Sequence, residues 1–375
     1  MATPLMPTKE FWLGESVLVV EPEPTDEGVS LADFARHELK ARGWCFFQTS
    51  GTEGIRKWAG LRKESLLVSA RAVNTHFDIS KHDHWLLALP THHVGGFGVL
   101  ARAFLSGSPV TRLDGKWDAA AFARLCAEAG ATLASLVPTQ VFDLVAAKAV
   151  APETMRAVLV GGGAMNSELE QAALDLGWPV RRTYGMTETC SQVASQREAG
   201  GEMEVLPIWH VSTETDSVLT VRGDALAEGY ATLEGGSWQW TPIPAGTGLR
   251  TRDRVTLWQE GSKQLLRFIG RETNTIKILG ELVALEPIQD RLEALRLELG
   301  IHYGEAVVCD MPDARQEARL VLAVSRMSAA DAQRLQKSLN AMLRPFERVE
   351  NTRMVDQIPR SALGKVLLDD LRRQF

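Results

Sequence analysis

The sequence predicts an α/β fold in two domains, a larger one built on a parallel sheet and a smaller α+β one at the C-terminal end. First, short apolar runs alternate with stretches of helical periodicity over most of the chain. Second, residues 203–270 change to short strands separated by Gly, Pro, Asp and Thr. Third, a compact set of helices and strands follows residue 271. Alternating strands and helices indicate a largely parallel sheet with both faces covered.

The elements of the larger domain follow in order. Helical periodicity predicts helices over residues 62–77, 117–129 and 166–176. The segment from His84 to Leu105 predicts a buried strand, a turn and a helix, because two histidines, Arg102 and several glycines interrupt its apolar run. Apolar runs predict buried strands at Trp85–Leu89, Leu133–Val137 and Ala157–Val160.

The second half of the chain predicts different pairing. Strands at Ser217–Val221 and Leu265–Ile269 belong to an antiparallel β-subdomain. The C-terminal unit then has two helices and two strands, at residues 286–299, 306–309, 319–324 and 328–343.

Composition excludes several classes of protein. The chain has 375 residues, 45% hydrophobic and 23% charged, which is ordinary for a globular protein. A net charge of −6 argues against a general nucleic-acid binder, so an anionic ligand needs local donors. Four cysteines without a Cys-x-x-Cys pair predict free thiols, neither a zinc site nor a disulfide framework. No signal-peptide pattern and no apolar stretch of about 20 residues occurs, which predicts a cytoplasmic protein away from membranes.

The segment from Thr49 to Lys57, Thr-Ser-Gly-Thr-Glu-Gly-Ile-Arg-Lys, is typical of a phosphate-binding loop. Small residues let backbone N–H groups converge on phosphate oxygens, and hydroxyls and the Lys57 ammonium add donors. A Walker loop would need Gly where Arg56 stands and Ser or Thr where Trp58 stands. Ser, Thr and Gly clusters are also ordinary turn material, so a solvated loop is the alternative.

Further motifs follow in one order. They are Pro90–Gly96 (PTHHVGG), Ala134–Gln140 (ASLVPTQ), Gly161–Ala164 (GGGA), Tyr184–Thr189 (YGMTET), Thr251–Asp253 (TRD), Gly270–Arg271, Ile276–Gly280 (IKILG) and Pro359–Lys365 (PRSALGK). Together they resemble the adenylate-forming superfamily of acyl-CoA synthetases, the AMP-binding enzymes, and within it the o-succinylbenzoate–CoA ligase branch. The resemblance covers residue 46 to the C-terminus.

The resemblance implies a large adenylate-forming domain over residues 1–270 and a small mobile domain over 271–375. It implies a ligase that uses ATP and Mg²⁺ to convert a carboxylate to an acyl-adenylate, and then transfers the acyl group to coenzyme A. Its substrate would be o-succinylbenzoate, in menaquinone biosynthesis. The partners are small molecules, and a homodimer is compatible with the family.

Catalytic roles are carried over onto matching residues. Lys365 matches the C-terminal lysine that contacts the carboxylate and the α-phosphate, although a lone lysine in a polar loop is usually a solvated surface residue. Thr187 resembles the hydroxyl on the α-phosphate, and Glu188 the carboxylate that places Mg²⁺, which keeps most of its waters. His93 gates the thioester site or is a satisfied core histidine.

Nucleotide contacts are implied in the same way. Asp253 would accept the ribose hydroxyls and Arg271 would lie near ribose and phosphate, with a turn residue and a surface ion pair as the alternatives. Tyr184 would stack on adenine, opposite backbone that glycine lets come close. The remaining residues matched to nucleotide or CoA are Ser50, Gly51, Thr52, Gly54, Lys57, Gly162, Gly163, Ala164, Gly185, Met186, Lys277 and Gly280.

The acyl pocket depends on Arg102. In this branch a histidine-glycine segment leads into a helix with an arginine, whose fork would pair with the substrate's second carboxylate. Arg102 facing solvent is the alternative. The other residues matched to the pocket are Pro138, Thr139, Gly185 and Thr189.

Several positions depart from the family. Arg56 stands where Pro or an apolar residue is usual, Arg252 replaces the commoner Gly before Asp253, and Thr273 replaces the hinge Asp or Lys. Only about 48 residues precede the phosphate loop, so much of the usual N-terminal subdomain is expected to be missing, in a compact natural variant. The alternatives are a ligase for another acid, an enzyme that loads a carrier-protein thiol, and a silent nucleotide-binding homologue.

Overall fold

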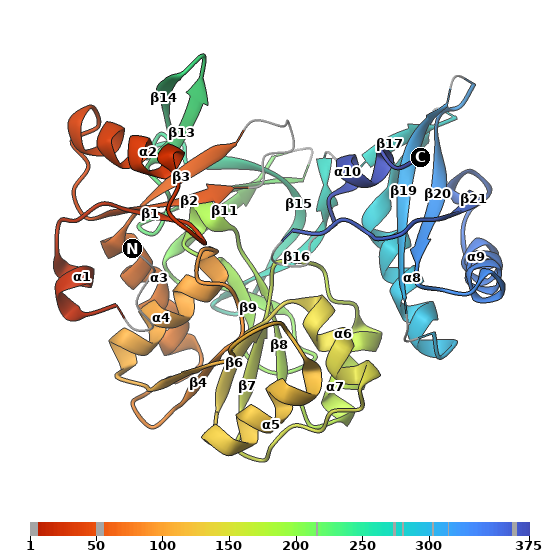
Figure 1. Cartoon of the computed structure of the whole chain (residues 1–375), viewed down its shortest axis with the longest axis horizontal. Helices are drawn as coiled ribbons and strands as arrows, with labels where there is room; N and C mark the ends of the chain where they lie inside the picture. Colours follow the sequence, from red (N-terminus) through yellow and green to blue (C-terminus); the bar gives the residue numbers. More distant parts are fainter. Residues whose placement is uncertain are drawn as a thin grey trace.

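The computed structural model describes residues 7–49, 56–214, 217–272, 275–279, 281–301, 304–313, 315–361 and 366–375. Two β-sheets and their helices make up the first part of the chain. A smaller group of helices and strands forms the C-terminal part, beside the end of the larger sheet (Figure 1).

The larger sheet has eleven strands within the described residues, in the order β11-β12-β15-β16-β10-β9-β8-β7-β6-β4-β5. Strands β4 to β8 pair in parallel. Their bounds are Trp85–Leu87 (β4), Val110–Arg112 (β5), Leu133–Leu136 (β6), Ala157–Val160 (β7) and Val180–Tyr184 (β8). Strands β4, β6 and β7 are buried along their whole length, as an apolar run in a doubly covered parallel sheet requires.

Three helices of this part begin and end close to the predicted bounds: α3 (Lys63–His76), α5 (Ala119–Ala129) and α7 (Ser167–Asp175). Helix α4 (Val94–Ser106) follows the strand and turn expected before it, and α6 (Pro138–Ala146) was not predicted. The side chains of Asp118 and Asn166 accept the first free backbone N–H groups of α5 and α7. Helices α4 and α5 end at Gly107 and Gly130, both with positive φ.

The antiparallel strands after β8 divide between two sheets. Six of them extend the larger sheet, of which the first lies before the predicted region 203–270: β9 (Ala194–Gln196), β10 (Met203–Val205), β11 (Trp209–Thr213), β12 (Val218–Gly223), β15 (Leu249–Glu260) and β16 (Lys263–Arg271). The hairpin β13 (Gly229–Glu234) and β14 (Ser237–Pro242) instead pairs with β3. These strands therefore satisfy edges that β8 and β3 would otherwise leave unpaired.

The N-terminal segment completes the second sheet, whose order is β1-β2-β3-β13-β14. Its strands are β1 (Leu18–Val20), β2 (Trp44–Thr49) and β3 (Lys57–Arg62). Helix α2 (Asp26–His37) buries Leu31 and Ala35 in a cluster with Phe46 and Trp58 from the sheet. Helix α1 (Lys9–Leu13) places Trp12 against Phe97 and Phe104 of α4, with ring centroids 5.6 and 5.8 Å away. The segment before the phosphate loop thus packs on both sheets.

The C-terminal part has its own apolar core, centred on side chains such as Leu292, Leu320 and Leu335. Its elements are β17 (Thr275–Ile278), β18 (Glu281–Ala284), α8 (Leu285–Glu298), β19 (Glu305–Asp313), β20 (Glu317–Ser325), α9 (Ala329–Met342), β21 (Val349–Met354) and α10 (Leu368–Arg372). It meets the larger part through α8: the Asn166 amide donates to the Asp290 carbonyl at 2.9 Å, and Arg296 lies 4.8 Å from the Phe142 ring centroid.

The described residues contain no disulfide, no membrane-spanning helix and no cluster of metal ligands. All four cysteines are buried and free, as the sequence predicts. No described helix combines the length and apolar character needed to cross a bilayer. Within the same residues, no group of three His, Cys, Asp or Glu side chains is arranged to hold a metal ion.

Candidate active site

The predicted site residues gather where the parallel strands end. Tyr184 is the last residue of β8, Pro138 and Thr139 open α6 just after β6, and His93 is the residue before α4. Ligands of open α/β sheets bind at this carboxyl edge, because loops and helix N-termini meet there. Strand order thus brings together motifs that are far apart in the sequence.

Arg102 is the most unusual side chain of the site. It is 2% exposed, so the alternative that it faces solvent is wrong. Its guanidinium donates to the Ser191 hydroxyl at 3.0 Å and, more weakly, to the Ser135 hydroxyl at 3.4 Å, and lies 5.7 Å from the Trp85 ring centroid. Burial lowers the pKa of Arg102 to about 10.

The charge of Arg102 has neutral surroundings. Among the described residues no carboxylate pairs with it, and its buried Nε has no hydrogen-bond partner. A Cβ at Gly98 would lie 3.1 Å from its terminal nitrogen, so glycine one turn earlier leaves room for the guanidinium. A buried cation held by two hydroxyls and a ring is costly without an anion, which makes it a candidate carboxylate-binding group.

Ser191 is a partner of Arg102 that the sequence analysis did not identify. Cys190 and Ser191 have φ values of +53° and +105°, in the region that favours glycine. The turn is held by Thr189, whose buried hydroxyl accepts from the Met186 N–H at 3.1 Å. Gly185 is required beside it, because a Cβ there would lie 1.6 Å from the Ser191 carbonyl oxygen. No local pattern signals this strain, which arises from the packing of the turn.

The nucleotide residues form a connected network. The Tyr184 hydroxyl donates to one Asp253 oxygen at 2.7 Å, and Arg271 Nε donates to the other at 2.7 Å. Burial, then the Asp253 charge, raises the pKa of Tyr184 well above its usual value. The Tyr184 ring stacks on Phe268, with centroids 5.9 Å apart. Three residues matched separately to adenine, ribose and phosphate are therefore neighbours.

His92 and His93 are adjacent rings at the start of α4, with centroids 4.4 Å apart. Burial, and then the neighbouring His92, lowers the pKa of His93 to about 4, and burial also lowers that of His92. Both are therefore neutral at physiological pH. The buried Nε2 of His93 has no partner among the described residues.

Thr187 and Glu188 lie in a short 3₁₀ turn after β8. The Tyr230 hydroxyl donates to Glu188 Oε1 at 3.0 Å, a contact that joins the β13 strand to the site. Burial raises the pKa of the Glu188 carboxyl. One carboxylate alone cannot make a metal site, but beside nucleotide phosphates it suits Mg²⁺, which keeps several waters. A cation would also favour the ionised form of a carboxyl with a raised pKa.

The predicted phosphate-binding segment, Thr49 to Lys57, begins at the end of β2 and ends at the start of β3. Thr49 pairs with Lys57 across the two strands, and the Thr49 hydroxyl donates to the Lys57 carbonyl at 3.3 Å. In the turn after β7, Gly162 has φ +79°, and Gly163 and Ala164 follow it. Lys277 is exposed in β17. Six predicted residues lie outside the described residues: Ser50, Gly51, Thr52, Gly54, Gly280 and Lys365.

The chain is similar in sequence to known enzymes. The family model for AMP-binding enzymes matches residues 17–215. The 2-succinylbenzoate–CoA ligase of Escherichia coli (strain K12) is 35% identical over 185 residues, which are 48% of this chain and 39% of that protein. The enzyme of the same name from Lactococcus lactis subsp. lactis is 25% identical over 360 residues, 91% of this chain and 72% of that protein. The chain thus spans less than half the length of the first of these relatives.

Two solved structures have the same fold. A substituted form of E. coli MenE with bound OSB-AMS aligns with a TM-score of 0.69 at 26% identity, covering 88% of this chain and 69% of that one. The o-succinylbenzoate CoA synthetase of Bacillus subtilis, in complex with the acyl-adenylate intermediate OSB-AMP, aligns with a TM-score of 0.71 at 20% identity, covering 95% and 78%. The α/β fold predicted from the sequence is confirmed.

Proposed function

Because the chain belongs to the AMP-binding enzyme family, we propose that it is an ATP-dependent carboxylate–CoA ligase whose acid is 2-succinylbenzoate. The buried charge of Arg102 is the observation that carries the choice of acid. A dicarboxylic acid has one carboxylate to react and one to bind, and the second would supply the anion that Arg102 lacks among its described neighbours. Names of relatives such as the E. coli ligase support the same acid.

In the first step, a carboxylate oxygen of the acid attacks the α-phosphorus of ATP, and the bond to pyrophosphate breaks. The protein contributes mainly position and charge. We assign contacts with the α-phosphate to Thr187 and, by resemblance, to Lys365. Lys57 and the residues before it would hold the outer phosphates.

The nucleoside would be held by the connected network at β8 and β15. Asp253 has two oxygens engaged by Tyr184 and Arg271, so its carboxylate is already oriented before ribose hydroxyls reach it. Glu188 would hold Mg²⁺ together with the phosphates, and the ion supplies charge neutralisation there.

In the second step, the sulfur of coenzyme A attacks the acyl carbon and AMP leaves. His93, at the start of α4, fits the role of a gate between the acyl pocket and the thiol of coenzyme A. Its imidazole is neutral, so it adds no charge to the route of the uncharged, thiol-bearing part of the coenzyme. We propose that residues 271–375 rotate after adenylation, so that Lys365 withdraws and Lys277 and Gly280 approach the coenzyme. We infer a cytoplasmic enzyme of small molecules.

Arg102→Lys tests the acid. We expect kcat/KM for 2-succinylbenzoate to fall at least 10-fold, because an ammonium cannot make the bidentate contact. An analogue that lacks the non-reacting carboxylate should lose much less. Pyrophosphate release and the CoA thioester, detected by mass, are the measurements, and Arg36→Ala on α2 is the matched surface control.

The other outcomes are equally informative. An equal loss with both acids would remove Arg102 from substrate recognition and leave the ligase chemistry. Turnover with another acid would replace the substrate, and transfer to a carrier-protein thiol in place of coenzyme A would replace the acceptor. No adenylate with any acid would identify a silent homologue.

A further inference from the structure

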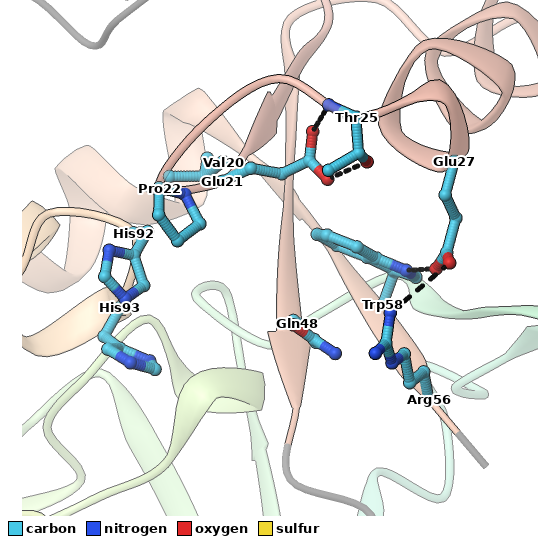
Figure 2. Close-up of a pocket in the computed structure, with 10 residues that line it drawn as sticks. All are labelled: Val20, Glu21, Pro22, Thr25, Glu27, Gln48, Arg56, Trp58, His92 and His93. Carbon is cyan, nitrogen blue, oxygen red and sulfur yellow. Dashed lines mark hydrogen bonds and ion pairs between the residues drawn. The ribbon is translucent and has the colours of Figure 1, made fainter. Parts of the chain in front are cut away.

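A cavity of about 370 Å³ lies between the N-terminal segment and the phosphate-loop hairpin (Figure 2). One wall comes from the β1–α2 connection and the start of α2, including Glu21 and Glu27. His92 and His93 also line the cavity, and Figure 2 shows them across Gln48 from Trp58 and Arg56. The segment before the loop is therefore part of the site's wall.

Both acidic side chains of this wall are already engaged. Glu21 accepts from the Thr25 hydroxyl at 2.6 Å and from the Thr25 N–H at 3.3 Å, which holds it at the start of α2. Glu27 accepts from Trp58 Nε1 at 3.0 Å, so its carboxylate is fixed on the β3 strand. The other oxygen of the Glu27 carboxylate, Oε2, lies 3.6 Å from Arg56 NH1.

Arg56 is the only Arg or Lys among the described residues that line the cavity. The two histidines beside it are neutral, because burial lowers their pKa values. Arg56 directly follows the hydroxyl- and glycine-rich segment and lies two positions before Trp58. Residues two apart share a face of an extended chain, which explains why both Arg56 and Trp58 reach Glu27.

The contact between Arg56 and Glu27 is weak and easily exchanged. The Arg56 side chain is 71% exposed and the Glu27 side chain 27% exposed. Exposed ion pairs of this length stabilise little, whereas a guanidinium binds phosphate oxygens through a planar fork. A polyphosphate reaching the mouth of the cavity would therefore compete well for Arg56.

We propose that Arg56 is a further ATP-binding residue, held by Glu27 in the free protein and transferred to the outer phosphates when ATP binds. This rests on the proposed function and adds a residue that the family pattern lacks, since Pro or an apolar residue is usual there. The outer phosphates are chosen because Arg56 lies in the sequence between the Ser-, Thr- and Gly-rich segment and Lys57, which are matched to those phosphates, whereas Thr187 is matched to the α-phosphate. Pyrophosphate shares this chemistry and is released from the same place.

Equilibrium binding of Mg·ATP, pyrophosphate and AMP to the full chain tests the proposal. Arg56→Ala should weaken ATP and pyrophosphate binding about 10-fold. It should leave AMP binding unchanged, because AMP has no outer phosphates. Arg36→Ala is the matched control, since Arg36 forms an exposed pair with Asp33 on α2 away from the cavity. Thermal denaturation shows that each variant is folded.

Glu27→Gln tests the holding role. The amide keeps an oxygen for Trp58 and removes the charge that faces Arg56, so ATP binding should strengthen about threefold. In Glu27→Gln/Arg56→Ala this gain should disappear, because it acts through Arg56. A gain that persists in the double variant would show simple repulsion between Glu27 and phosphate and would overturn the transfer.

Two results contradict the role of Arg56 itself. One is ATP binding by Arg56→Ala at the wild-type affinity. The other is an equal loss of ATP and AMP, which indicates a structural role. Failure of the proposed function looks different, because the unaltered protein would then form no CoA thioester of 2-succinylbenzoate, whatever Arg56→Ala does to ATP binding.

Discussion

Arg102 and Ser191 combine a buried charge with a strained backbone, both of which are costly. Ser191 keeps a backbone angle of +105° that glycine would adopt with less strain, yet its hydroxyl is 3.0 Å from the Arg102 guanidinium. Strained backbone of this kind persists when surrounding contacts enforce it and is common at binding sites. The hydroxyl orients a cation whose own carboxylate partner would come with the substrate.

Two substitutions of Ser191 separate strain from function. Ser191→Ala and Ser191→Gly both remove the hydroxyl, so both should raise KM for 2-succinylbenzoate about 5-fold. Ser191→Gly should also be more stable than Ser191→Ala by about 1 kcal/mol, because glycine adopts positive φ without the Cβ clash. Steady-state kinetics and urea denaturation measure the two effects. Equal stability of the variants would show that Ser191 is unstrained.

At the scale of elements, one buried lysine ties the N-terminal segment to the rest of the chain. Lys63, 2% exposed at the start of α3, donates to the carbonyls of Phe11 and Gly14 at 2.8 and 3.2 Å and to the Ser16 hydroxyl at 2.8 Å. Its ammonium also lies 4.1 Å from the Phe11 ring centroid. Helix α1 is only five residues long, so these tertiary contacts must hold it.

Lys63→Met should destabilise the protein by about 2 kcal/mol, because it leaves two carbonyls and a hydroxyl without their donor. Cleavage by a protease within residues 7–20 should become faster. Arg62→Met is the neighbouring control: Arg62 forms a half-exposed pair with Glu228, so its loss should cost less than about 1 kcal/mol. An equal loss of unfolding free energy in the two variants would show that Lys63 does not hold the N-terminal segment.

At the scale of the whole molecule, the contact between the two parts of the chain contains a carboxyl that resists ionisation. Asp290 belongs to α8, and its backbone carbonyl accepts a hydrogen bond from the Asn166 amide of the larger part. Burial, followed by the charges of Glu286, Glu293 and Glu168, raises the pKa of Asp290 to about 6. The Asp290 carboxyl therefore holds its proton more tightly in the folded protein than in the unfolded chain.

This makes docking sensitive to pH. An acid with a raised pKa contributes stability below its unfolded value of 3.8, and that contribution is lost as pH rises through about 6. Asp290→Asn should thus raise the melting temperature by about 2 °C at pH 8 and by about half as much at pH 5, which lies between the unfolded and folded pKa values. Glu298→Gln, on the same helix, controls for the general loss of a negative charge. An equal shift at both pH values would exclude the Asp290 titration.

The sequence alone predicted the α/β class because apolar periodicity is local and strong. Helix α5 and strand β7, for example, begin and end within two residues of the predicted bounds. It also proposed residues for the site, since motif order does not depend on coordinates, and the roles of these residues stay predictions. Lys365 and the residues 50–55 of the loop lie outside the described residues, so their roles stay predictions.

Pairing partners could not be predicted, because a strand pattern does not say which edge it will meet. The hairpin β13–β14 has the same strand pattern in its sequence as the neighbouring strands, but it pairs with β3. That pairing places the Tyr230 hydroxyl within hydrogen-bond distance of Glu188. Ser191, Tyr230 and the contact between Glu27 and Trp58 were all missed for this reason. Each joins residues that are distant in the chain, and no local signal marks them.

The sequence by itself determined the family, the chemistry that its residues can perform and the elements that carry them, because residue types and periodicity are properties of the chain. Only the tertiary structure decided that Arg102 is buried with neutral partners, that Asp253 is shared by Tyr184 and Arg271, and that the N-terminal segment forms a wall of the site. Burial and charge pairing depend on which elements pack together, and that is settled by the folded chain as a whole.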